Sequence, residues 1–213
     1  MTLITEPTQL VEACRRLANE TFLSIDTEFM REKTYYPQLC LIQIAGKKEA
    51  IVIDALAEDI NLNPVLELME NEAITKVFHA CRQDIEIFYN LNHKIPSPIF
   101  DTQIGAMVCG YGESVGYDKL VRQITGIQID KSSRFTDWSY RPLSKQQIKY
   151  ALSDVTHLRT VFEALSSQLE KSGRTKWLEE EFKTVLNPET YNTPLDKSWK
   201  RLKVKNGQPR FLI

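Results

Sequence analysis

The chain has 213 residues, of which 42% are hydrophobic and 26% are charged, and its formal net charge is −1. This length is enough for one domain with a full core, and the composition is that of an ordinary soluble globular protein. No apolar run approaches the roughly 18 residues that a membrane span needs. The N-terminus, MTLITEPTQL, also lacks the basic and apolar regions of a secretory signal. We therefore expect a cytoplasmic protein with no membrane partner.

Charge distribution and cysteine usage narrow the possibilities further. A near-neutral chain gives no general sign of nucleic-acid binding. However, six basic and no acidic residues lie between Lys197 and Arg210. This stretch is either a solvated tail or an arm that contacts phosphates. The four cysteines are scattered without a CxxC pair, so we expect small buried thiols and no zinc cluster.

The apolar patterning predicts strands and helices in alternation. The expected strands are 22–29, 39–45, 50–54, 76–80 and a short one at 99–101, with a tight turn at 46–48. The expected helices are 8–20, 63–69, 81–91, one from residue 102, 144–170 and 174–186. Strands alternating with helices imply an α/β fold. The opening meander indicates that the first strands are antiparallel, which makes the sheet mixed.

The helix over 144–170 has the clearest signals. Ser144 with Gln147 three residues later forms a capping box. Apolar residues then recur at helical spacing, and Ser172-Gly173 is a fitting stop. Asn187-Pro188 breaks the next helix, so we expect the compact domain to end near residue 190.

Two acids interrupt the first apolar strand, FLSIDTEFM, over residues 22–30. Strand side chains alternate, so Asp26 and Glu28 share one face, roughly 6.5 Å apart along the strand, and Thr27 faces the other way. Burying two carboxylates together is unfavourable and raises at least one pKa. Either this face is solvated and the pair has no role, or the pair binds a cation, most naturally a divalent metal.

Further carboxylates are placed where they can join this pair. Asp84 follows the 76–80 strand at the start of a helix, where strand–helix junctions commonly build sites. Alternatively, it is a first-turn acid that the helix dipole stabilises. Tyr150 and Asp154 are four residues apart, so they lie on one face of their helix. A tyrosine there can also be an amphipathic residue at the edge of the core.

Together these residues predict a metal-dependent active site. Oxygen ligands without paired cysteine or histidine select Mg²⁺ or Mn²⁺. Two such ions can stabilise the attacking and leaving oxygens of a phosphoryl displacement, and Tyr150 would position the attacking water. The predicted catalytic residues are Asp26, Glu28, Asp84, Tyr150 and Asp154.

Three motifs carry a resemblance to a known family. DTE (26–28), HACRQD (79–84) and YALSD (150–154) resemble the motifs of the DEDD superfamily of 3′–5′ exonucleases, in its tyrosine-bearing branch. TYYPQLCLIQ (34–43), FDTQIGA (100–106) and DKSSRFTDW (130–138) are similar to ribonuclease D. The resemblance covers residues 20–186 in the right order.

The resemblance implies an RNase-H-like mixed sheet flanked by helices. It also implies a 3′–5′ exoribonuclease that releases nucleoside 5′-monophosphates, with tRNA precursors as substrates and no obligate protein partner. Asp26, Glu28 and Asp154 would then hold one ion. Asp26 would bridge to the second ion, which Asp84 would hold directly or through water, and Tyr150 would orient the nucleophile.

The resemblance also suggests substrate contacts near the metals. In the family the 130–138 segment lies close to the active site, so Lys131 and Arg134 are candidates to contact RNA, with a solvated loop as the alternative. Phe29 can stack on a terminal base or pack in the core. The full set of candidates is Thr27, Phe29, His79, Lys131 and Arg134. His79 is expected to be a supporting or core residue and no metal ligand, and Asp101 to be structural.

The C-terminal segment differs from ribonuclease D, which carries helical HRDC domains after its nuclease domain. We expect residues 1–190 to form the exonuclease domain and residues 191–213 to be a basic linker leading to a missing HRDC domain. The apolar end, Phe211–Ile213, indicates a truncated chain.

Alternative functions remain at this stage. One is a 3′–5′ exonuclease acting on DNA or very short RNAs, because no residue reports on the 2′-hydroxyl. Another is a non-catalytic RNA-binding module, which would not need the four acids and Tyr150. A sugar-cleaving carboxylate pair would not need the other two acids.

Overall fold

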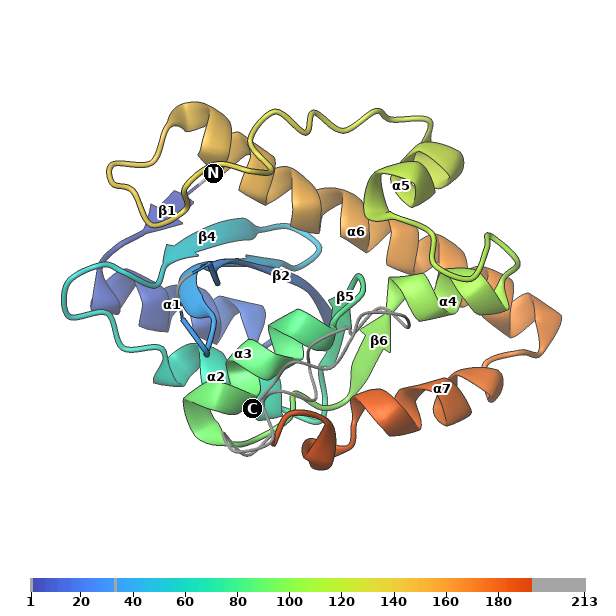
Figure 1. The fold of residues 1–213 in the computed structure, drawn as a ribbon. Coiled ribbons are helices and arrows are strands. Elements are labelled where there is room, and N and C mark those ends of the chain that lie inside the picture. Colours follow the sequence, from blue (N-terminus) through green and yellow to red (C-terminus); the bar gives the residue numbers. More distant parts are fainter. Residues whose placement is uncertain (1, 33, 193–213) are drawn as a thin grey trace, which may run out of the picture.

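The structure, a computed structural model, describes residues 2–32 and 34–192. Within this part, six strands form one mixed sheet in the order β1-β4-β3-β2-β5-β6 (Figure 1). The strands are β1 (Thr2–Ile4), β2 (Phe22–Met30), β3 (Gln38–Ala45), β4 (Ala50–Asp54), β5 (Thr75–Phe78) and β6 (Ile99–Asp101).

The pairing confirms the mixed sheet. Strands β2, β3 and β4 form an antiparallel meander, and β5 and β6 extend it from β2 in parallel. The sequence prediction missed β1, which pairs in parallel with β4 at the edge. A strand of three residues is too short to show alternation, so only its pairing defines it.

The helices largely follow the predicted ranges. They are α1 (Pro7–Leu17), α2 (Asn63–Glu70), α3 (Arg82–Asn92), α4 (Thr102–Val108), α5 (Tyr117–Thr125), α6 (Lys145–Ser172) and α7 (Trp177–Val185), followed by the short 3-10 turn η1 (Pro188–Thr190). The capping box of α6 is confirmed, since Gln147 N donates to Ser144 Oγ at 3.1 Å and Ser144 N donates to Gln147 Oε1 at 2.9 Å. Helix α5 was not predicted.

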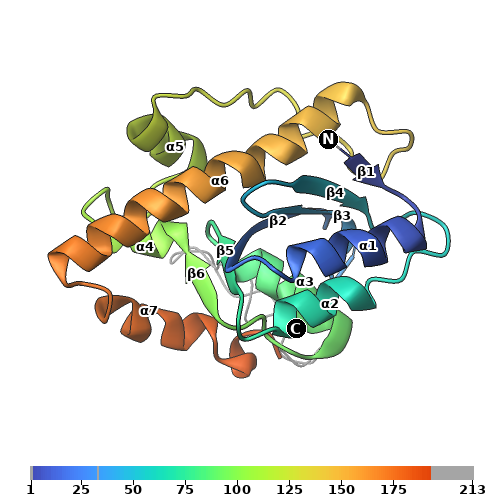
Figure 2. The ribbon, with the colours of Figure 1, turned by 180° about the vertical axis from the view of Figure 1, so that it is seen from behind.

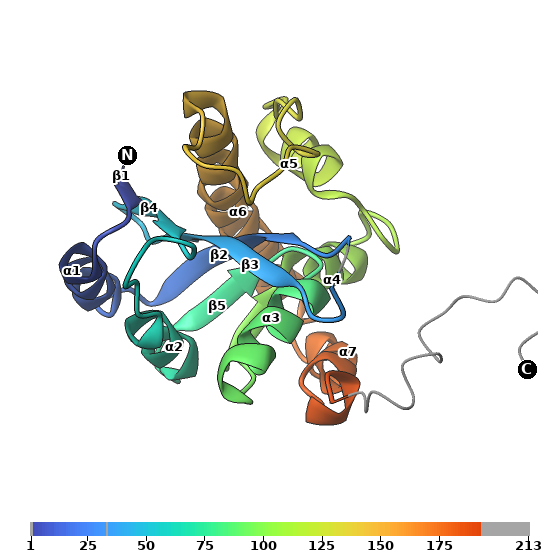
Figure 3. The same ribbon diagram turned by 60° about the vertical axis from the view of Figure 1, so that its left-hand side comes forward.

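The helices cover both faces of the sheet. Figure 3 shows α1, α2 and α3 on one side and α5 and α6 on the other. The first layer encloses a core that includes Leu23, Ile25, Ile42 and Ile44 from the sheet. Helix α6 lies diagonally across the opposite face (Figure 2) and packs on β2, β3 and β4. A smaller core that includes Leu41, Val52 and Leu152 fills this second interface.

Strand β2 is therefore apolar on one face and carries polar residues beneath α6. The pairing of β2 with β3 is regular until Glu28, which opposes Leu41, and Phe29 then opposes Leu39. Cys40 is the extra residue of this β-bulge. Bulges next to active sites commonly redirect side chains, and this one lies beside the DTE motif.

Two further findings complete the fold. No helix in the described part of the chain is long and apolar enough to cross a membrane. Cys14, Cys40 and Cys81 are buried free thiols, as predicted, and Cys109 is a half-buried free thiol. The predicted basic linker lies almost entirely outside the described residues.

Candidate active site

Three of the four predicted acids meet between β2 and α6. Asp26 and Glu28 project from β2 toward α6, and Asp154 projects from α6 toward β2. One carboxylate oxygen of each lies within 4.8 Å of the others, and this is the only such group of three or more metal-ligating residue types among the described residues. The sheet and the helix thus bring together acids that are more than a hundred positions apart.

The acids perturb one another strongly. Burial raises the pKa of Asp26 well above its usual range, and the charge of Asp154 adds to the effect. Burial likewise raises the pKa of Glu28 to about 10, with further contributions from Asp26 and Asp154. Burial raises the pKa of Asp154 to about 7, although a hydrogen bond with Tyr150 and the charge of Arg134 oppose the rise.

This electrostatic pattern fits a divalent cation. Three clustered carboxyls cannot all ionise in a buried site without a compensating charge. A hard cation would supply that charge and restore ordinary ionisation, and carboxylate oxygens are the ligands that Mg²⁺ and Mn²⁺ favour. The donor set therefore fits the predicted metal, although its identity stays a prediction.

Asp84 is near this cluster but outside it. It lies in the first turn of α3, and its Oδ1 accepts a hydrogen bond of 2.6 Å from the Thr27 hydroxyl. Burial raises its pKa well above the usual range, and Asp26 is the nearby charge that contributes most. The structure thus places Asp84 beside Asp26 without bringing it into the tight group, so its role at a second ion stays a prediction.

Tyr150 lies next to the cluster, as the i,i+4 spacing predicts. Burial raises its pKa above the ordinary value of 10.0, and the charges of Asp154 and Glu28 act in the same direction. Its ring is tilted by 31° against that of Trp138, with centroids 6.0 Å apart. Tyr150 therefore remains a neutral phenol, which can donate and accept hydrogen bonds but cannot act as a strong base.

A cavity of about 570 Å³ contains this site, and all five candidate substrate contacts line it. Arg134 is exposed at the cavity, and its charge acts on Asp154, Glu28 and Tyr150. Lys131 pairs with Asp118 at 2.6 Å, so its charge is partly neutralised. These residues line the cavity in the structure, whereas their contact with substrate stays a prediction.

The HACRQD segment has a supporting role in the structure. His79 Nδ1 lies 3.0 Å from the Thr102 hydroxyl, and burial lowers the pKa of His79. Ala80 has φ 56°, which is unusual for a residue other than glycine. Asp101 holds this turn by accepting the N–H groups of Ala80 and Cys81, both at 2.9 Å. The prediction that Asp101 is structural is confirmed.

Phe135 and Tyr117 are among the residues of the cavity wall that sequence reasoning missed. Phe135 is 90% exposed at the cavity beside Arg134, whose guanidinium lies 5.2 Å from the ring centroid. Tyr117, at the start of α5, donates its hydroxyl to the Asp154 carbonyl and fixes that turn of α6. The amphipathic run after Gly116 was the available signal for α5. Nothing in the sequence distinguishes an exposed phenylalanine from a buried one.

The chain is similar to known exonucleases along most of its length. A family model described as 3′-5′ exonuclease matches residues 1–170. Ribonuclease D of Bartonella henselae is 53% identical over 212 residues, which are 100% of this chain and 52% of that protein. Ribonuclease D of Nitrobacter hamburgensis is 52% identical, with coverage of 100% and 56%. The chain thus spans about half the length of the curated relatives it matches.

Solved structures agree with this similarity. The crystal structure of Escherichia coli RNase D, described as an exoribonuclease involved in structured RNA processing, superposes with a TM-score of 0.87 at 32% identity. The match covers 94% of this chain and 53% of that one. NrnC of Brucella melitensis, solved bound to pGG, has a TM-score of 0.72 at 28% identity, with coverage of 90% and 92%. NrnC has also been solved with bound Mg²⁺.

Proposed function

We propose that this chain, which belongs to the 3′-5′ exonuclease family, is the nuclease domain of a ribonuclease D-like, metal-dependent exoribonuclease. It hydrolyses RNA from the 3′ end and releases nucleoside 5′-monophosphates. The observation that carries the proposal is the group of Asp26, Glu28 and Asp154, whose carboxylate oxygens lie within 4.8 Å of one another beside Tyr150. A non-catalytic RNA-binding module would not need this arrangement.

The acids act as metal ligands. Asp26, Glu28 and Asp154 would hold one divalent ion, and Asp26 with Asp84 would hold a second. Bound Mg²⁺ or Mn²⁺ supplies a water of lowered pKa and stabilises negative charge on the leaving oxygen. The protein contributes a rigid frame for these ligands, because β2 is packed on one face by α1–α3 and on the other by α6.

Tyr150 orients the nucleophile and does not deprotonate it. Its raised pKa keeps the phenol protonated across the physiological range. The single O–H of the phenol donates to Asp154, and the phenol oxygen can then accept a hydrogen bond from an attacking water. We therefore expect Tyr150 to affect mainly the rate of the chemical step.

The cavity rim supplies the contacts to RNA. Arg134 places a positive charge next to the acids, where the substrate phosphate must approach. The exposed ring of Phe135 offers a stacking surface for a base near the 3′ end, and such stacking tolerates any sequence. tRNA precursors remain the proposed physiological RNA, and the cytoplasm remains the proposed location.

A second candidate function is hydrolysis of very short RNAs. NrnC, a neighbour at 28% identity, has been solved bound to pGG, and this chain covers 92% of it. The same acid group would serve both reactions, so substrate length must be tested directly.

The test offers four substrates to the full chain: a 3′-extended tRNA, a single-stranded RNA, the matched DNA and pGG. Each is incubated with Mg²⁺ or Mn²⁺, and with EDTA. We expect stepwise shortening of the RNAs from the 3′ end that requires metal, and a slower reaction on DNA. If only pGG is cleaved, the second candidate replaces the first.

Two variants test the assigned roles. Asp26→Asn should abolish shortening, whereas Glu163→Gln, which changes an exposed acid on the outer side of α6, should not. Activity that survives both EDTA and Asp26→Asn would refute the metal mechanism. Tyr150→Phe should lower kcat at least 100-fold while Mn²⁺ still binds in calorimetry.

A further inference from the structure

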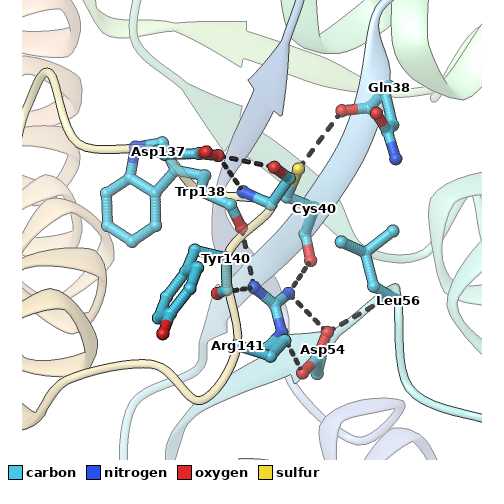
Figure 4. A network of polar contacts seen from close by, with 9 residues as sticks. Gln38, Cys40, Asp54, Leu56, Asp137, Trp138, Tyr140 and Arg141 are labelled. Atoms are coloured by element: carbon cyan, nitrogen blue, oxygen red, sulfur yellow. Dashed lines mark hydrogen bonds and ion pairs between the residues drawn. The ribbon is translucent and has the colours of Figure 1, made fainter.

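A network of five hydrogen bonds surrounds Arg141 in the segment before α6, and three of them reach β3 and β4 of the sheet (Figure 4). The Nε and Nη2 groups of Arg141 donate to the two carboxylate oxygens of Asp54, at 2.7 and 2.6 Å. Nη2 also donates to the Cys40 carbonyl at 3.2 Å. Nη1 donates to the carbonyls of Trp138 and Tyr140, at 2.7 and 2.9 Å. These contacts use all five N–H donors of the guanidinium. We call this network the Arg141 clamp.

One end of the clamp lies at the β-bulge beside the active site. Cys40 is the extra residue of β3 where the pairing shifts between Glu28 and Phe29. Its carbonyl also accepts the Ala55 N–H at 3.1 Å. The clamp therefore fixes the sheet at the position where Glu28 emerges toward α6.

The other end of the clamp holds Trp138. The Trp138 backbone carbonyl accepts from Arg141, and the indole is only 3% exposed. The indole packs with Ala151 and Leu152 of α6 and lies against the Tyr150 ring at 6.0 Å between centroids. Movement of residue 138 would therefore remove the surface against which the phenol rests.

We propose that Arg141 and Trp138 are positioning residues that hold the Tyr150 phenol at the catalytic carboxylates. The inference rests on the proposed nuclease function. Neither side chain lines the cavity that contains the acids, although Trp138 borders an adjoining pocket of about 260 Å³ together with Glu28 and Arg134. The ring contact of Trp138 with Tyr150 is the connection that the kinetic test below isolates. The proposal also links two of the stretches that resemble ribonuclease D, since Cys40 lies in TYYPQLCLIQ and Trp138 in DKSSRFTDW.

Arg141→Lys is the most direct perturbation. Lysine keeps the positive charge but cannot make the two-pronged contact with Asp54 together with three carbonyl contacts. The chain offers a matched control in Arg16→Lys. Arg16 forms a similar two-pronged contact with Glu49, at 3.0 and 2.6 Å, on an exposed surface of α1 and away from the cavity.

The kinetic test measures kcat and KM of the full chain on single-stranded RNA with saturating Mn²⁺. Arg141→Lys should lower kcat at least tenfold and change KM less than twofold, while Arg16→Lys changes neither beyond twofold. In a Tyr150→Phe background, Arg141→Lys should cost less than a further threefold, because the group it positions is gone. An unchanged kcat, an effect confined to KM, or equal losses in both backgrounds would overturn the inference.

A second readout follows Trp138 itself, in a chain whose other two tryptophans are replaced by Trp177→Phe and Trp199→Phe. Acrylamide should quench Trp138 fluorescence poorly, and Arg141→Lys should raise the quenching constant at least twofold. An unchanged quenching constant would count against the clamp.

If Arg141→Lys does not fold, Trp138→Phe tests the inference in its place. We expect the same loss of kcat in this variant and the same dependence of that loss on Tyr150. Wild-type kcat in that variant would refute the inference. A wild-type chain without metal-dependent activity would instead refute the proposed function and this inference with it.

Discussion

The acid cluster should make the metal-free protein less stable as the pH rises. In the folded chain, burial raises the pKa of Asp154 from 3.8 to about 7 and that of Glu28 from 4.5 to about 10. At a pH between the unfolded and the folded pKa of one of these groups, the folded chain keeps a proton that the unfolded chain has released. The stabilising contribution of each group is therefore complete below its unfolded pKa and is lost as the pH rises toward its folded pKa.

Asp154 allows the size of this effect to be worked out. In the folded state its side chain is protonated at pH 5 and about half ionised at pH 7, whereas in the unfolded state it is ionised throughout this range. One such proton changes the free energy of unfolding by about 1.4 kcal/mol per pH unit. Wild type should therefore lose about 2 kcal/mol over these two units relative to Asp154→Asn. Asp154 also raises the pKa of Asp26 and of Glu28. Asp154→Asn should therefore lower both pKa values and further weaken the pH dependence of stability.

Urea unfolding in EDTA at pH 5, 6 and 7 measures this difference, with Glu163→Gln as a control on the same helix. Glu163→Gln should follow wild type, whereas Asp154→Asn should show the shallower pH dependence. Mn²⁺ at pH 7 should restore stability to wild type and not to Asp154→Asn, because the ion binds the ionised cluster. Parallel pH profiles for wild type and Asp154→Asn would refute the reasoning.

Three further predictions concern the scaffold, and urea unfolding checks each of them. Lys76 is fully buried, and its ammonium donates to three backbone carbonyls; Lys76→Met should therefore destabilise by about 3 kcal/mol. The control Lys94→Met removes an exposed ion pair and should cost less than about 1 kcal/mol. Gly105→Ala should destabilise by about 1–3 kcal/mol, since its new Cβ would lie 2.8 Å from Cζ of Phe100. Ser144→Ala should cost about 1 kcal/mol through loss of the capping box. Stability equal to wild type in any of these variants would contradict the contact named for it.

The elements with strong local signals were predictable from the sequence. Strand β2 and helix α6 were found with nearly correct limits, because one is an apolar β-rich run and the other has a capping box and a long apolar stripe. Strand β1 and helix α5 were missed. The first is too short for a pattern, whereas the second has an amphipathic run after Gly116 that could have predicted it.

Two local arrangements within the candidate site could be predicted from the sequence. Alternation on a strand places Asp26 and Glu28 on one face, and helical spacing places Tyr150 beside Asp154. These are local properties of the backbone, so they hold wherever the elements are packed.

The way in which these residues are brought together, and what supports them, is seen only in the folded chain. Folding brought Asp154 onto β2 and left Asp84 bonded to Thr27 outside the tight group. It also placed Arg141 where its five donors meet Asp54 and three carbonyls. Such contacts join residues that are distant in sequence, and they depend on packing that no local pattern encodes.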